Sequence, residues 1–190
     1  MHTKVKGDVQ EMERAHLERE IAQIRRRSVW RTVEVGTLTA GELVERIEHR
    51  GCRVGNRVKK FIVPRMHAAL SPRTARLCDV TVKDLEGGKD LDAEAVYAAG
   101  AQWGLHLCEP EVGFRVMLNM VDELGHLQDE WIRLAMKPLY TEFYENGSGK
   151  MLSVLFLNRD QRGEFHLGVA QANPGVVWGR ERRIIFELPD

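Results

Sequence analysis

Residues 151–171 read MLSVLFLNRDQRGEFHLGVAQ, in which two apolar segments flank the polar connection RDQRG. Both segments are rich in residues that favour extended backbone. The connection contains Gly163, and a short polar loop with glycine is typical of a hairpin. The stretch therefore predicts a β-hairpin, and the other strands of the second half are expected to join it.

Three more segments of the second half are predicted as strands. Residues 114–120 (FRVMLNM) alternate between apolar and other side chains, and residues 130–136 (EWIRLAM) are expected to pair with them. Residues 182–188 (RRIIFEL) close the chain as the last strand. With the hairpin, these segments predict an antiparallel sheet of about five strands that has one face on the core.

The first half has helix signals. Thr39 is expected to cap a helix, because Glu42 lies three residues later as in a capping box, and Gly51 is expected to end it. A second helix is predicted over residues 55–62 and a third over residues 93–103.

Two short strands and one turn complete this half. Residues 29–35 (VWRTVEV) and 77–85 (LCDVTVKDL) alternate and are rich in β-branched residues, which predicts strands. Pro110 favours the start of a brief helical turn that ends at Gly113. The fold class expected is α+β, with N-terminal helices and short strands followed by a C-terminal antiparallel sheet of about five strands.

The domain organisation predicted is one α+β domain over residues 29–190, with a helical half at 29–113 and a β-rich half at 114–190. Residues 1–28 are predicted to form a separate charged helix. An oligomer through residues 9–27 is one use of this helix, and packing on its own domain is the other.

The charge of the chain is unevenly distributed. The formal net charge is zero, yet residues 1–80 hold 17 Lys or Arg against 10 Asp or Glu, and residues 81–190 hold 11 against 18. This asymmetry indicates either a polyanionic partner for the first half or electrostatic docking of the two halves on each other.

Residues 49–78 concentrate the positive charge, because they contain no carboxylate. Phosphate contact requires such a surface, and the helix–Gly–helix pattern resembles a helix-turn-helix hairpin. A solvated helical face, or a surface that docks the acidic half, is the alternative. The residues predicted to bind a nucleic acid or an acidic partner are Arg50, Arg53, Arg57, Lys59, Lys60, Arg65, Arg73 and Arg76.

A second candidate site contains His106, Cys108 and Glu111. Cys108 is a possible nucleophile with His106 as its base, because residues two apart in a strand share a face. The neighbouring carboxylates argue against this chemistry, since they raise the pKa of a thiol. Cys108 as a core residue is the alternative.

The aromatic residues of the second half have two possible roles. They either fill the core of the sheet or line a groove for a ligand, a peptide or stacked bases. The residues concerned are Trp131, Tyr140, Phe143, Tyr144, Phe165 and Trp178.

No nucleotide-binding glycine loop, metal-binding motif or catalytic signature is found in the sequence, so no cofactor and no metal are expected. The three cysteines form no CxxC motif. The N-terminus has no apolar leader and no segment is long and apolar enough to span a membrane, which predicts a cytoplasmic protein.

The segments WRTVEVGTL, HRGCRVGNRVKKFI, WGLHLCEPEVGFRVML, DEWIRLAMKPL and WGRERRIIFELP follow one another in this order. They resemble an uncharacterised family of small proteins that recurs in candidate-phyla-radiation bacteria. Its members have the run Gly-Leu-x-Leu-Cys-Pro-Ala-Glu-Val-Gly, a Gly-Glu-Trp strand and a late strand rich in Trp and Arg. The matching residues here are Gly104, Leu105, Leu107, Cys108, Pro110, Glu111, Val112, Gly113, Glu130, Trp131, Trp178, Arg182, Arg183 and Phe186.

The chain departs from this family at Glu109-Pro110, where Pro-Ala is usual, at Phe114, where proline is common, and in its N-terminal helix. The resemblance implies one compact fold and brings no chemistry. Three functions are therefore considered, of which the first is preferred: a binding protein that uses the basic helical surface, an enzyme with its site near His106, and a self-associating protein.

Overall fold

The computed structural model confirms the hairpin. Strand β7 (Gly149–Arg159) pairs antiparallel with β8 (Phe165–Gln171), and Leu157 lies opposite Leu167. Gly163 in the connecting turn has a φ of 82°, which favours glycine. The structure describes residues 16–17, 19–21, 23–24, 26–66, 71–86, 89–122, 131–143, 149–160 and 162–189.

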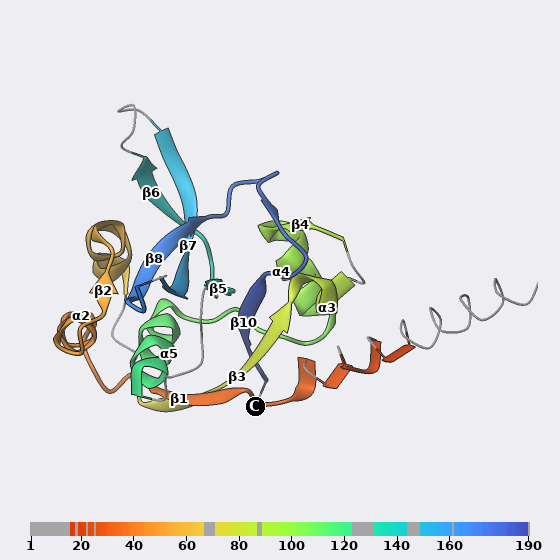
Figure 1. The fold of residues 1–190 in the computed structure, drawn as a ribbon, viewed down its shortest axis with the longest axis horizontal. Helices are drawn as coiled ribbons and strands as arrows, with labels where there is room; N and C mark the ends of the chain where they lie inside the picture. Colours follow the sequence, from red (N-terminus) through yellow and green to blue (C-terminus); the bar gives the residue numbers. More distant parts are fainter. Residues whose placement is uncertain are drawn as a thin grey trace, which may run out of the picture.

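The other elements follow the chain from the N-terminal side to the C-terminal side (Figure 1). They are β1 (Arg31–Val35), α2 (Ala40–His49), β2 (Arg53–Val54), the π-helical turn η1 (Val58–Ile62), the 3₁₀ turn η2 (Val63–Arg65), β3 (Arg73–Thr81), α3 (Val82–Glu86), β4 (Leu91–Asp92), α4 (Ala93–Gln102), α5 (Pro110–Asp122), β5 (Trp131–Leu134), β6 (Leu139–Phe143), β9 (Val177–Trp178) and β10 (Arg183–Glu187).

Within the described residues, eight strands form one sheet in the order β1-β3-β10-β5-β7-β8-β2, and β6 also pairs with β7. The pairs β5–β10 and β2–β8 are parallel, and the other pairs of this sheet are antiparallel. The α+β class is confirmed. The expected sheet of about five strands is wrong, because β1, β2 and β3 from the first half belong to the same sheet.

The largest local correction concerns residues 114–120, which are helical and form part of α5 rather than a strand. A run that is almost entirely apolar fits both the period of a strand and that of a helix. The less buried Arg115 and Asn119 lie four residues apart on α5, and this polar spacing is the helical signal. The brief helical turn expected over residues 110–113 is the first turn of this helix.

The helix caps follow the sequence closely. Thr39 and Glu42 form the predicted capping box at the start of α2, and the side chain of Asp92 accepts from the Ala95 amide at the start of α4. Residues 77–85 are extended only as far as Thr81. There the Asp84 carboxylate accepts from the Thr81 amide and hydroxyl, and the chain turns into α3.

Helices pack on both faces of the sheet. On one face, a Cβ added to Gly113 of α5 would lie 3.0 Å from Leu155 and 3.4 Å from Leu134. Ile185 is in register with Leu134, so the next residue, Phe186, points to the opposite face. Phe186 there meets α4 at Gly100. Because α5 also contacts β1 and α2, the sheet bends around α5 (Figure 1).

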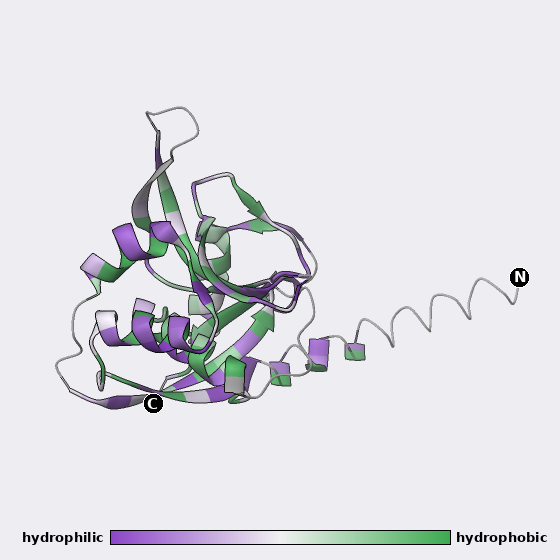
Figure 2. Cartoon of the chain, turned by 60° about the vertical axis from the view of Figure 1, so that its left-hand side comes forward, coloured by the Kyte–Doolittle hydropathy of each residue, from purple (hydrophilic) through white to green (hydrophobic). Residues whose placement is uncertain are grey.

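Several described residues between 16 and 27 are helical and lead away from the sheet (Figure 2). Leu17, Ile21 and Ile24 are exposed. Arg26 is buried, and its guanidinium carbon lies 3.5 Å from the centre of the Trp103 ring. Residues 1–15 lie outside the described residues, and an oligomer through residues 9–27 stays a prediction.

In the part of the chain that the structure describes, no helix has the length and apolar character needed to cross a membrane.

The contact between Gly100 and Phe186 predicts a stability difference. A Cβ added to Gly100 would lie 2.5 Å from the buried Phe186 ring, so Gly100→Ala should lower the free energy of unfolding by about 1–3 kcal/mol. Gly41 of α2 is exposed with no atom within 4 Å of an added Cβ, so Gly41→Ala should leave stability unchanged or slightly raised. Urea unfolding measures both, and equal stability of the two variants would contradict the packing described.

Candidate functional site

The structure divides the eight predicted basic residues into two groups. Arg73 and Arg76 lie on β3, near one end of the sheet order, whereas β2 is at the other end. The remaining six lie on or beside α2, β2, η1 and η2, and we call them the basic edge: Arg50, Arg53, Arg57, Lys59, Lys60 and Arg65.

Arg73 and Arg76 both hold the C-terminal segment. Arg73 forms an ion pair with Glu187 of β10, and Arg76 Nη1 donates to the Pro189 carbonyl over 3.3 Å. These two cations therefore contact the second half of the same chain, Arg73 through an ion pair and Arg76 through a backbone carbonyl.

Several cations of the basic edge also have protein partners. Lys59 lies 2.5 Å from Glu48, and Arg50 Nη1 donates to the Leu118 carbonyl over 3.0 Å. Arg65 Nη1 donates to the carbonyls of Phe61 and Tyr140. Arg53, by contrast, is exposed on the outermost strand and makes no ion pair within the described residues.

The helix-turn-helix pattern is not formed. The connection between the two basic helical segments contains β2, which pairs with β8 in the sheet. The second segment is a π-helical turn followed by a 3₁₀ turn, with Val58, Phe61 and Ile62 buried. A strand between the segments fixes them to the sheet edge, so η1 does not stand out as a recognition helix.

The residues His106, Cys108 and Glu111 do not form a catalytic group. His106 is exposed, whereas the Cys108 sulfur is buried and donates to the Ile185 carbonyl over 3.7 Å. Burial raises the pKa of the Cys108 thiol well above its ordinary value. Glu111 Oε1 accepts from the Gly36 amide over 2.9 Å and from Arg115, which gives it a structural role between α5 and the end of β1.

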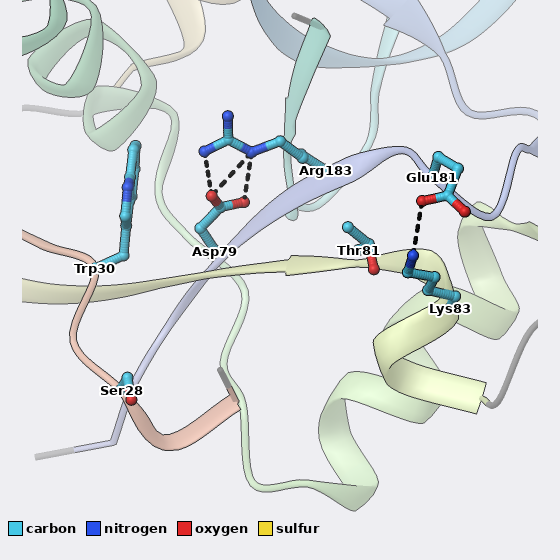
Figure 3. Close-up of a pocket in the computed structure, with 7 residues that line it drawn as sticks. All are labelled: Ser28, Trp30, Asp79, Thr81, Lys83, Glu181 and Arg183. Atoms are coloured by element: carbon cyan, nitrogen blue, oxygen red, sulfur yellow. Dashed lines mark hydrogen bonds and ion pairs between the residues drawn. The ribbon is translucent and has the colours of Figure 1, made fainter. Parts of the chain in front are cut away.

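A shallow cavity of about 570 Å³ lies beside the start of β10 (Figure 3). Two ion pairs line it, Asp79–Arg183 and Lys83–Glu181, and Trp30 forms one wall. Each charge in these pairs is matched by an opposite one, so the cavity offers no net charge to an ionic ligand. Sequence analysis did not indicate this cavity, because its lining comes from three segments that are far apart in the sequence, residues 28–30, 79–83 and 181–183.

The exposed aromatic surface of the sheet is a stronger candidate. Trp131 begins β5 with 45% of its surface exposed, and its ring stacks on Phe156 at 4.6 Å between centres and 19° between planes. The His166 ring meets the edge of Phe156 at 5.5 Å. We call Trp131, Phe156 and His166 the aromatic face.

The pairing register explains why these rings meet. Trp131 lies opposite Asn158, and Asn158 lies opposite His166, so these three residues share one face of the sheet. Phe156 lies two residues before Asn158 on β7 and therefore points to the same face. Gly168 lies opposite Phe156, and a Cβ added to it would lie 2.5 Å from the Phe156 ring. Glycine at this position is therefore needed to seat Phe156 against β8.

Cations surround the aromatic face. Arg53 of β2 is in register with His166, and Arg133 of β5 is in register with Phe156. Arg183 pairs with Ile132, so the preceding residue, Arg182, lies beside Trp131 on the same face. None of Arg53, Arg133 and Arg182 forms an ion pair within the described residues.

The sequence anticipated this face only in part. Arg53 was among the predicted basic residues, and Trp131 among the aromatics with a possible groove role. Trp178 is fully buried and Phe165 is buried, as the core alternative expects, whereas Tyr140 is exposed. The side chains of Phe143 and Tyr144 lie outside the described residues.

No cluster of three His, Cys, Asp or Glu residues that could bind a metal ion occurs within the described ranges. Comparison of the chain with protein-family models, with curated proteins and with solved structures finds no match. The resemblance to the candidate-phyla-radiation family and the cytoplasmic location therefore stay predictions.

The burial of the thiols predicts their reactivity. Cys52, Cys78 and Cys108 are all free and buried, and burial raises the pKa of Cys78 to about 11. We expect Ellman's reagent at pH 8 to leave all three unmodified in the folded protein and to modify all three in urea. Rapid modification of one thiol that Cys108→Ala abolishes would restore Cys108 as a candidate nucleophile.

The environment of His166 predicts a pH effect. Burial and the positive charge of Arg53 lower the pKa of His166 below 6.5. As the pH falls, the unfolded chain therefore binds a proton at His166 before the folded chain does. The contribution of neutral His166 to the free energy of unfolding is thus full above pH 6.5 and is lost as the pH drops below that value.

Histidine NMR titration measures this pKa directly. Arg53→Gln should raise the pKa of His166, because it removes the second cause of the shift, whereas Arg162→Gln, at an exposed arginine of the β7–β8 turn, should leave it unchanged. A His166 pKa at or above 6.5 in the parent protein would contradict the half-buried position of this ring.

Proposed function

We propose that this chain is a non-enzymatic binding protein that holds single-stranded nucleic acid on the aromatic face. The observation that supports the proposal is Trp131. One side of its ring stacks on Phe156, which fixes its orientation, and 45% of the residue is exposed. Arg182 and Arg53 lie on the same sheet face and bring positive charge to its surroundings.

Each part of this arrangement matches one part of a nucleotide chain. Every base has a flat face that stacks on an exposed aromatic ring, whatever its sequence. Cations without carboxylate partners attract the phosphates, because binding releases condensed counterions. Arg53, in register with His166, belongs to the basic edge, which offers a continuation for the phosphate backbone beyond His166.

A single strand fits this surface better than a duplex. Bases in a duplex are stacked on one another, and a protein that reads them usually inserts a helix or a β-ribbon into a groove. The segment once expected to supply a recognition helix is held at the sheet edge by β2. An exposed sheet face with fixed aromatic rings instead offers a platform for unpaired bases, with weak sequence preference.

Fluorescence anisotropy with labelled single-stranded and duplex DNA and RNA tests the proposal. Single strands should bind more tightly than duplexes, and log affinity should fall linearly with log salt concentration. Trp131→Ala should weaken binding by about fivefold to 150-fold, because stacking of one base is worth about 1–3 kcal/mol. Trp131→Phe should retain most of the affinity.

Trp103 provides the matched control. It is exposed to 42%, close to the value for Trp131, but its ring lies against Arg26 and its Nε1 donates to the Leu85 carbonyl. Trp103→Ala should leave the affinity for single strands unchanged. Absence of binding at the lowest salt would overturn the proposal, and binding of polyglutamate that is indifferent to Trp131→Ala would indicate an acidic protein partner instead.

A further inference from the structure

Arg133 has an unusual environment beside the aromatic face. Its guanidinium carbon lies 4.7 Å from the centre of the buried Trp178 ring. Its Nε and Nη1 atoms are buried and have no hydrogen-bond partner in the described structure. Buried donors without an acceptor are rare, because their lost hydration is not replaced, and such groups often mark the place of a bound ion or water.

Arg182 has the same property and lies close to Arg133. Its Nε atom is also buried without a partner. The pKa of Arg133 is lowered to about 10, mainly by burial and secondly by the positive charge of Arg182. Two like charges therefore lie near each other in a half-buried place, with no carboxylate paired to either in the described structure, and an anion bound there would neutralise them.

A third donor faces the same place. The Tyr97 hydroxyl of α4 is buried and lies beside the Met136 backbone. The Tyr97 ring meets Trp178 edge-on at 6.0 Å, and Trp178 lies under Arg133. Tyr97, Arg133 and Trp178 are therefore neighbours between the sheet and α4, with Arg182 on the side towards Trp131. We call the place where these side chains meet the niche.

We propose that Arg133 and Arg182 bind the phosphate group of a nucleotide whose base stacks on Trp131. Guanidinium groups form paired hydrogen bonds with phosphate oxygens, and Trp178 holds that of Arg133 in a fixed orientation. Both arginines are half-buried, so part of each side chain is reached from solvent. Arg182 flanks Trp131 in the sheet register, which sets base and phosphate side by side.

This inference rests on the proposed function and makes it more specific. Water in the niche would satisfy hydrogen bonds but would not neutralise two positive charges. A carboxylate would neutralise one charge, whereas a terminal phosphate carries nearly two negative charges and three strong acceptor oxygens. The site should therefore prefer an end or a mononucleotide with a phosphate monoester.

Isothermal titration with AMP, adenosine and inorganic phosphate tests the inference, with a single-stranded oligonucleotide titrated in parallel. AMP should bind at least about tenfold more tightly than either of its parts, because only AMP contacts Trp131 and both arginines. Arg182→Gln should weaken AMP binding about tenfold or more. Arg180→Gln removes the same charge from an exposed arginine nearby and should have little effect.

Arg133→Gln is expected to have a similar effect, but it also removes the contact with Trp178. Its folding is checked by urea unfolding, and Arg133→Lys keeps the positive charge for comparison. Lysine should restore only part of the affinity, because it lacks the paired donors of arginine.

The outcomes separate the two proposals. Oligonucleotide binding without AMP binding would overturn the phosphate site and leave the proposed function intact. AMP binding that depends on Arg182, without oligonucleotide binding, would support the phosphate site and overturn single-strand binding. No binding of either ligand overturns both. Equal affinities for inorganic phosphate and AMP would overturn the stacking of the base on Trp131.

Discussion

The last strand, β10, joins two parts of the sheet that the chain forms far apart. Its one edge pairs antiparallel with β3 and its other edge pairs parallel with β5. Ile184, Ile185 and Phe186 at its centre are fully buried, because both faces of this strand are covered by helices. Without β10, the pair β1–β3 would have no hydrogen-bonded connection to the hairpin β7–β8, and α4 would lose Phe186.

This central position also explains part of the charge asymmetry. Both ends of β10 carry ion pairs with β3, Arg183 with Asp79 at the start and Glu187 with Arg73 at the end. Two of the eight predicted basic residues thus hold the C-terminal segment. Both pairs are partly buried, with the Asp79 and Glu187 side chains each 13% exposed, and they connect the two ends of β10 to β3. The proposed binding surface draws instead on Arg53, near the opposite end of the sheet order, and on Arg133 and Arg182 near its centre.

The sequence predicted what depends on neighbouring residues. The hairpin, the capping box at Thr39 and the helix predicted over residues 93–103 depend on local signals, and all three are present. The strand order was not predictable, because β3 and β10 lie about 100 residues apart and their pairing leaves no periodic trace in either segment. Helix α5 was missed for a different reason, since an apolar run satisfies both periods and only its sparse polar residues favour the helix.

The candidate site shows the same limit. Each of its residues is ordinary in the sequence, where Arg133 looks like any polar position of an alternating strand and Trp178 like any core aromatic. The pairing of β5 with both β7 and β10 brings Arg133, Trp131 and Arg182 onto one face, and the packing of α4 and β9 adds Tyr97 and Trp178.

The physical consequence is that the arginine which would contact a phosphate is held by the core and not by a mobile surface segment. A side chain that is already ordered loses little entropy on binding. The desolvation of Arg133 has meanwhile occurred during folding, when β5 packed against α4 and β9. A phosphate bound at this niche, as proposed, would restore hydrogen bonds that folding removed, which would give binding a driving force that an exposed arginine of the basic edge does not have.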